Sequence, residues 1–120
     1  MTDPMNSDES LANALPLEGV RVLDLATFIA GPFSTTIMGE FGAEVIKIEQ
    51  PGVGDPLRRF GTEAPCGDSL IWLQESRNKK CITLDLRKPD GKALLESLVE
   101  KSDVLVENFR TGTLERWGVG

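Results

Sequence analysis

Residues 20–25 (Val-Arg-Val-Leu-Asp-Leu), 30–32 (Ala-Gly-Pro) and 43–49 (Ala-Glu-Val-Ile-Lys-Ile-Glu) decide the fold of this chain. Both longer runs are short, β-branched and mostly apolar, which is typical of strands that are covered on both faces. Pro32 suits the first turn of a helix, because its missing N–H has no intrahelical partner there. The stretch therefore predicts a strand over 20–25, a helix opened by Pro32 and a strand over 44–49, which form a parallel βαβ unit.

The rest of the chain continues this alternation of strands and helices. A turn-rich excursion follows the second strand, and Pro89 opens a helix whose apolar residues fall on one stripe that should face the sheet. The fold class is therefore α/β, with a mostly parallel sheet and flanking helices. The expected segments are loops over 50–56 and 61–68, a short helix over 70–73, a strand over 81–86, a helix with the stripe Leu94, Leu95, Leu98 and Val99, a strand over 104–106, and a last helix over 113–117 that Gly118 stops.

Length and composition favour one small domain. No apolar run approaches the ~20 residues that a membrane-spanning helix needs, so we expect no membrane partner. A net charge of −6 without a basic cluster of sufficient size argues against a nucleic-acid partner. Two cysteines are too few for a disulfide framework and indicate a reducing compartment, for which the cytoplasm is the default.

The first fifteen residues differ in character from the rest. They contain Asp3, Asp8 and Glu9 but no Lys or Arg, which fits neither a signal peptide nor a transit peptide. We expect residues 1–15 to form a disordered acidic leader and residues 16–120 to form the folded part. Since doubly wound sheets usually carry about five or six strands, four predicted strands lead us to expect a remainder of the domain beyond Gly120.

Polar and glycine-rich segments follow each of the four predicted strands. In a parallel sheet the carboxyl ends of the strands meet at one edge, where ligands bind. Free helix N–H groups, a glycine loop and cationic side chains at that edge suit a long ligand that carries phosphates. The alternative is that these are ordinary polar loops. The segments are residues 26–31, 50–55, 87–88 and 108–110.

Several common sites are excluded by the residues themselves. Gly52 and Gly54 resemble the start of a dinucleotide fingerprint, but Leu57 stands at the third glycine position and Pro56 interrupts the helix that should begin there. No glycine loop ends in Gly-Lys-Ser or Gly-Lys-Thr, so a P-loop is absent as well. The sequence contains no histidine, which rules out a histidine base, triad or metal ligand within this span, and we expect no metal site.

Two groups of basic residues have two interpretations each. Arg77, Lys79 and Lys80 either clamp a phosphate or form a solvated charged face. Arg116 either reaches across the loop at Asn108 or pairs with a neighbouring glutamate.

Other chemically distinctive residues favour structural roles. Asp24 and Asp85 interrupt predicted strands, and we expect them to satisfy backbone groups or to face a loop. Cys81 lies in a predicted strand without an activating partner, so we expect an inert buried thiol. Trp72 and Trp117 are expected to anchor packing rather than to stack on a ligand.

Six motifs in register resemble the amino-terminal part of family III coenzyme A transferases, the CaiB/BaiF type. The resemblance extends from Leu15 to Gly120 and implies a Rossmann-like large domain, a second domain further along the chain and an interlocked homodimer. The motifs are Pro-Leu-Glu-Gly-Val-Arg-Val-Leu-Asp-Leu, Ala-Gly-Pro-Phe, Gly-Ala-Glu-Val-Ile-Lys-Ile-Glu, Gly-Asp-Pro, Arg-Asn-Lys-Lys with Ile-Thr-Leu-Asp-Leu, and Asp-Val-Leu-Val-Glu-Asn-Phe-Arg.

The resemblance also implies a reaction. In that family an aspartate attacks an acyl-CoA, and CoA passes to a carboxylic acid through an aspartyl anhydride and an aspartyl-CoA thioester. That aspartate would lie beyond Gly120, so the resemblance assigns no catalytic residue here. Acyl-CoA is then a substrate, and no permanently bound cofactor is implied. The alternatives are an acyl-CoA racemase of the same family and a non-catalytic piece that binds CoA or dimerises.

Family positions that touch CoA have counterparts in this chain, and they coincide with the strand-end segments. Ile29 stands where formyl-CoA transferases carry glutamine, and we expect an acyl group that is partly apolar there and longer than formyl. Gln50 stands where those enzymes carry arginine, which removes one cation. By motif register the predicted contacts are Ile29, Ala30, Gln50, Leu84 through Arg87, Asn108, Phe109, Arg110 and Arg116.

Overall fold

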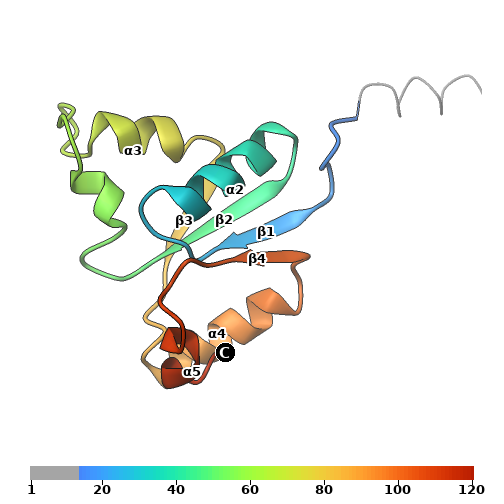
Figure 1. Ribbon diagram of the computed structural model, residues 1–120. Coiled ribbons are helices and arrows are strands. Elements are labelled where there is room, and N and C mark those ends of the chain that lie inside the picture. Colours follow the sequence, from blue (N-terminus) through green and yellow to red (C-terminus); the bar gives the residue numbers. More distant parts are fainter. Residues whose placement is uncertain (1–13) are drawn as a thin grey trace, which may run out of the picture.

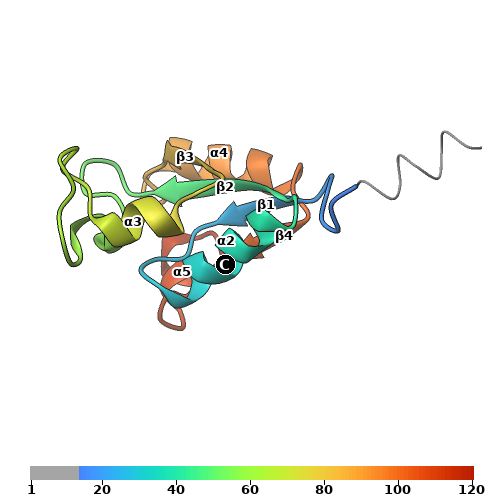
Figure 2. The same ribbon diagram turned by 90° about the horizontal axis from the view of Figure 1, so that it is seen from above.

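The computed structural model describes residues 14–120, which form a four-stranded sheet in which all neighbouring strands are parallel. The strand order β3-β2-β1-β4 is the order with which a Rossmann-type sheet begins, and it confirms the predicted α/β fold class. In Figure 2 the arrows of β1 and β2 point the same way. The strands are β1 (Arg21–Asp24), β2 (Glu44–Glu49), β3 (Lys79–Thr83) and β4 (Val104–Val106).

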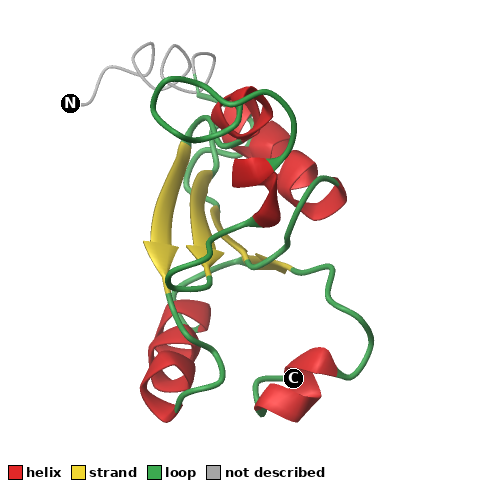
Figure 3. Cartoon of the chain, turned by 90° about the vertical axis from the view of Figure 1, so that its left-hand side faces the viewer, coloured by secondary structure: helices red, strands yellow, loops and turns green. Residues whose placement is uncertain are grey.

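Helices cover both faces of the sheet (Figure 1). The longer helices α2 and α4 lie on opposite faces, and Figure 3 shows the yellow strands between two sets of red helices. Ser69 starts α3, because its side chain accepts a hydrogen bond from the Trp72 N–H, and Gly118 ends α5 with a φ of +73°. The helices are α2 (Ala30–Glu40), the 3₁₀ helix η1 (Pro56–Arg59), α3 (Leu70–Glu75), α4 (Pro89–Val99) and α5 (Thr113–Trp117).

Two small apolar cores result from this arrangement. On the α2 face, Val22 and Val45 pack with Ala43 and the partly buried Met38. The core on the α4 face consists of Leu23, Leu25, Ile48, Leu86 and Leu95. The central strands β1 and β2 contribute to both cores, which explains their nearly continuous apolar pattern.

The predicted apolar stripe of α4 is only partly correct. Leu95 is buried and Leu98 packs against the same core, but Leu94 and Val99 are 55% and 44% exposed. Leu95 and Leu98 pack against Leu23 of β1 and Ile48 of β2, and Leu94 and Val99 do not belong to this core.

The third strand is also displaced from its prediction. It spans Lys79–Thr83 rather than residues 81–86, because its partner β2 ends at Glu49, which pairs with Thr83. Leu84 then donates one last hydrogen bond to the Glu49 carbonyl, and the chain turns at Asp85. Since β3 lies at the sheet edge, Cys81 is exposed, and the expectation of a buried thiol is wrong.

The excursion between β2 and β3 is held by one arginine. Arg58 donates two hydrogen bonds to Glu49, of 2.7 and 2.8 Å, and also pairs with Asp68 at 3.0 Å. Its guanidinium carbon lies 4.0 Å from the ring centroid of Trp72, which is buried as expected for a packing anchor. These contacts raise the pKa of Arg58. Burial raises the pKa of Glu49, but the hydrogen bonds from Arg58 and the Asp55 amide outweigh it and bring that pKa below its ordinary value.

The predicted acidic leader lies outside the described residues except for Ala14 and Leu15. Leu15 already belongs to the ordered turn that precedes β1, since its carbonyl accepts a hydrogen bond from Glu18. Within residues 14–120, no helix has the length and apolar character needed to cross a membrane.

Candidate functional site

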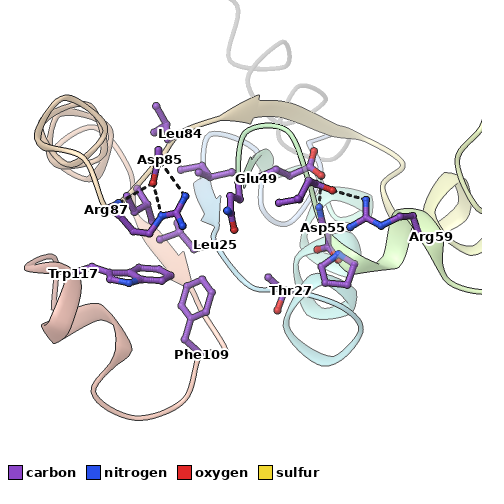
Figure 4. A pocket seen from close by; sticks show the side chains of 16 residues that line it. Leu25, Thr27, Glu49, Asp55, Arg59, Leu84, Asp85, Arg87, Phe109 and Trp117 are labelled. Atoms are coloured by element: carbon purple, nitrogen blue, oxygen red, sulfur yellow. Dashed lines mark hydrogen bonds and ion pairs between the residues drawn. The ribbon is translucent and has the colours of Figure 1, made fainter.

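A pocket of about 270 Å³ opens at the carboxyl edge of the sheet (Figure 4). Ligand crevices of open α/β sheets lie at this edge, because every strand directs its following loop there. All four strand-end regions contribute to the wall, as the sequence predicts. The lining comes from Leu25 and Thr27 after β1, residues 48–50, 53–56 and 59 around the loop after β2, residues 84–87 after β3, Phe109 after β4, and Trp117 of α5.

Six of the predicted contact residues line this pocket: Gln50, Leu84, Asp85, Leu86, Arg87 and Phe109. Gln50 is exposed directly after β2, and Leu84 and Phe109 are partly buried. The fold brings these six side chains together, and their role as CoA contacts stays a prediction.

The other five predicted residues lie outside the pocket lining. Ile29 is the residue before α2 and is 43% exposed, and Ala30 is the first residue of that helix. Asn108 uses its side-chain amide on the backbone of another loop, whereas Arg110 is exposed. Arg116 donates to the Thr113 hydroxyl at 3.0 Å rather than to a glutamate or to the Asn108 loop, so neither expected partner is found.

Arg87 reaches the pocket with its charge already shared. Its guanidinium donates to both carboxylate oxygens of Asp85, at 2.8 and 3.1 Å, and its amide donates to the same carboxylate. These hydrogen bonds lower the pKa of Asp85 and raise the pKa of Arg87. The expectation that Asp85 satisfies nearby backbone groups is confirmed, and Arg87 is consequently a pre-oriented cation at the pocket wall.

Arg59 and Trp117 are pocket residues that the sequence reasoning did not assign to the site. Arg59 ends the 3₁₀ helix η1 and donates to the Val53 carbonyl, which holds its side chain along the glycine loop. Trp117 packs edge-on against Phe109 with ring centroids 5.3 Å apart, so it anchors packing as expected and also presents an aromatic wall (Figure 4). The pair of arginines that follows Gly-Asp-Pro was the available sequence signal for Arg59.

A buried charge cluster next to the pocket, which shares Asp55 with the pocket wall, was likewise not foreseen. The Lys47 ammonium lies 2.9 Å from the Asp55 carboxylate and 3.6 Å from that of Asp24, and all three side chains are at most 1% exposed. Lys79 also pairs with Asp24 at 2.9 Å. Burial lowers the pKa of Lys79, although the Asp24 charge opposes this. The cluster contains two acids and two bases, so the interior charge is balanced.

The cluster changes the interpretation of the predicted basic group. Lys79 points into the interior, Arg77 pairs with Glu40 at 2.5 Å, and Lys80 pairs with Glu44 at 2.6 Å. The expectation of a wholly solvated face is wrong for Lys79, which is buried, and Arg77 and Lys80 have carboxylate partners at the surface. Asp24 satisfies the Ala26 amide, as expected, but its main contacts are the two buried lysines.

Comparison with known proteins places these features in a family. The model of CoA-transferase family III matches residues 17–120. Over 119 residues, the chain is 54% identical to the succinyl-CoA–L-malate CoA-transferase alpha subunit of Chloroflexus aurantiacus, covering 98% of this chain and 28% of that protein. It is 44% identical over 108 residues to the human succinyl-CoA:glutarate CoA-transferase, covering 90% of this chain and 25% of that protein.

Solved structures agree with the sequence relatives. A CaiB/BaiF family protein from Brucella suis superimposes with a TM-score of 0.80 at 35% identity, covering 90% of this chain and 29% of that one. The chain thus spans between a quarter and three-tenths of the length of these relatives. The family match over residues 17–120, the parallel sheet and the strand-end pocket together show that this chain belongs to CoA-transferase family III.

Proposed function

We propose that this chain is the amino-terminal, CoA-binding part of an enzyme that moves CoA between an acyl-CoA donor and a carboxylic acid. The observation that carries the proposal is the pocket at the carboxyl edge, where two arginines and two aromatic rings face one cleft. Arginine matches phosphate oxygens with a planar fork, and aromatic rings offer apolar surface. Both features suit the diphosphate and the remaining body of CoA.

The pocket accounts for only part of such a ligand. Its volume of about 270 Å³ lies at the lower end of the range for small-molecule sites, so it accommodates one portion of a molecule as long as CoA. The thioester end would then extend past the loop after β1 toward Ile29 and Ala30, at the start of α2. Arg110 and Arg116 are exposed and remain proposed contacts outside the pocket lining.

The proposed chemistry uses an aspartate beyond Gly120. Its carboxylate attacks the acyl carbonyl, the C–S bond breaks, and CoA leaves as a thiolate, which gives an acyl-aspartyl anhydride. Within this proposal residues 17–120 bind and orient CoA and supply no nucleophile. The named relatives given above are CoA-transferases, which supports transfer over the racemase alternative.

Ile29 leads to a proposal about the acyl group. An isoleucine gives no hydrogen bond, so a polar acyl group against it would be desolvated without a partner. We therefore propose a short dicarboxylic or aliphatic acyl group that is longer than formyl. The similar proteins include succinyl-CoA enzymes and also a formyl-CoA:oxalate CoA-transferase, so Ile29 and not the names of the relatives carries this proposal.

The proposal includes an interlocked homodimer in the cytoplasm. The alternative is an assembly of two related chains, since two relatives from Chloroflexus aurantiacus are named as alpha and beta subunits. A mass measurement in solution, combined with separation of any two chains, distinguishes these assemblies.

A CoA-transfer assay tests the function. The protein encoded by the complete reading frame that contains this chain is incubated with succinyl-CoA and a panel of carboxylic acids, and new acyl-CoA species are detected by mass spectrometry. We expect transfer with the complete protein, and CoA binding without transfer with the 120-residue chain. Transfer by the 120-residue chain alone would refute the location of the nucleophile, and absence of CoA binding by both would refute the proposed site.

A further inference from the structure

Side chains from three other segments hold the loop between β1 and α2, in addition to the backbone hydrogen bonds that Leu25 and Ala26 donate to the Val106 carbonyl. The Asn108 amide accepts from the Thr27 N–H and donates to the Thr27 carbonyl, both at 2.8 Å. The Lys47 ammonium donates to the Ala26 carbonyl. Since loops usually satisfy their backbone with water or with each other, this concentration of distant partners indicates a loop whose conformation is specified.

Asp55 holds the next peptide group of the loop, whose N–H belongs to Phe28. Its Oδ1 accepts from the Phe28 N–H at 3.0 Å and from the Leu57 N–H at 2.9 Å, while its Oδ2 binds the Lys47 ammonium at 2.9 Å. The carboxylate is therefore oriented by Lys47, and the hydrogen bond to Phe28 has a fixed direction. Asp55 is 2% exposed, so water does not compete for these contacts.

Phe28 occupies a backbone conformation that needs such support. Its φ is +67°, and a residue with a Cβ rarely adopts this left-handed region without compensating contacts. Phe28 is 37% exposed, and its ring packs edge-on against Phe60, with centroids 5.0 Å apart. Among the described residues, the hydrogen bond from the Phe28 N–H to the buried Asp55 carboxylate is therefore the main contact that holds this peptide group.

We propose that Asp55, oriented by Lys47, is a positioning residue of the CoA site, which keeps Phe28 in its left-handed conformation and thereby presents Ile29 and Ala30 to the ligand. This inference rests on the proposed function. Asp55 does not react with the substrate. Its role is to make the loop rigid before the ligand arrives, so that binding costs less conformational entropy.

Two double variants separate positioning from stability. Removal of Asp55 or Lys47 alone would leave an unpaired buried charge, which often unfolds a protein. Lys47→Met/Asp55→Asn removes both charges but keeps an amide oxygen that can accept from the Phe28 N–H. Lys47→Met/Asp55→Leu removes the same charges and the acceptor. The two variants have nearly the same shape and identical net charge, so they differ mainly in the acceptor that serves the Phe28 and Leu57 N–H groups.

Three measurements are made on both variants and on the unaltered chain. Urea unfolding identifies conditions in which each protein is folded. Hydrogen exchange at the Phe28 amide is followed by NMR, and CoA affinity is measured by calorimetry. If the leucine variant keeps the binding-competent loop for about a tenth of the time, its Kd rises about tenfold relative to the asparagine variant. Because the loop is then open for about nine-tenths of the time, its Phe28 amide should exchange at close to the rate of an unprotected amide, and clearly faster than in the asparagine variant.

The outcomes decide the two proposals separately. Faster exchange with weaker CoA binding in the leucine variant supports the positioning role. Equal CoA affinity of the two folded variants overturns it, whatever their stabilities. If the unaltered chain binds no CoA, the proposed function fails, and the exchange data alone then decide whether Asp55 fixes the loop: equal exchange rates at Phe28 overturn that claim as well.

Discussion

Arg59 and Arg87 present two guanidinium groups to the pocket from different walls (Figure 4). Arg87 shares its charge with Asp85, whereas the hydrogen bond from Arg59 goes to a neutral carbonyl, that of Val53. A cation that contacts only a carbonyl keeps its full charge for an incoming anion. At the scale of single residues, Arg59 is therefore the more available of the two, and we propose that it offsets the cation that Gln50 does not provide.

We expect Arg59→Gln and Arg87→Gln each to weaken CoA binding. A hydrogen bond to a charged group contributes about 1.5 to 3 kcal/mol, which corresponds to a loss of roughly ten- to a hundredfold in affinity. Calorimetric titration with CoA measures the loss. Arg77→Gln is the matched control, because Arg77 pairs with Glu40 and does not line the pocket. An equal loss in all three variants would indicate a general charge effect instead of a phosphate site.

At the scale of elements, one glutamate joins three parallel strands. Glu44 of β2 binds Arg21 of β1 at 2.5 Å and Lys80 of β3 at 2.6 Å. Hydrogen bonds from Lys80 and then Arg21 lower the pKa of Glu44 from 4.5 to about 2. Because the folded-state pKa is below the unfolded value, this group stabilises the fold above pH 4.5, and its contribution is lost as the pH falls toward 2.

Glu44→Gln should therefore flatten the pH dependence of the free energy of unfolding between about pH 5 and pH 2. Urea unfolding at several pH values measures this slope, and added salt should diminish the difference because the pairs are partly exposed. The control is Glu96→Gln. Glu96 is an exposed residue of α4, and the described residues supply no ion-pair partner for it. Identical slopes for Glu44→Gln and the unaltered chain would contradict the assigned role.

Two helical glycines should respond oppositely to alanine. A Cβ at Gly91 of α4 would lie 2.1 Å from the Asp85 carbonyl oxygen, so the helix must shift and the free energy of unfolding should fall by about 1 to 3 kcal/mol. A Cβ at Gly39 of α2 would lie 3.5 Å from its nearest neighbour, a methyl carbon of Val45. Alanine there should instead raise the free energy of unfolding by about 0.5 to 1 kcal/mol. Chemical denaturation of both variants checks the opposite signs. A stabilised Gly91→Ala variant would show that α4 does not approach Asp85 this closely.

The sequence predicts elements better than it predicts their contacts. The strand pattern of 20–25 and 44–49 is unambiguous, because central strands are buried on both faces. The edge strand β3 is only partly predictable, since its length depends on where β2 ends. The charge of Lys47 within an apolar strand was a visible signal of a buried ion pair, but its partner Asp55 lies in a loop, and only the folded chain brings the two together.

At the scale of the whole molecule, the parallel arrangement collects the chemistry. Four loops that are far apart in sequence meet at the carboxyl edge, and they supply the pocket, its arginines and its aromatic wall. The candidate site was predictable as a region, because strand direction alone determines where the loops gather. The individual contacts of Arg59 and Asp55 depend on the path of the excursion after β2, which has no regular pattern.

The central claim is that CoA binds at this edge, and an NMR titration of the isotopically labelled chain with CoA tests it most directly. We expect the largest amide shift changes at Thr27, Gln50, residues 53–59, residues 84–87, Phe109 and Trp117. The groove between α4 and α5, lined by Leu95, Val99 and Leu114, serves as the internal reference and should change little. Largest changes in that groove or around Arg77 and Lys80, or no changes at saturating CoA, would contradict the account.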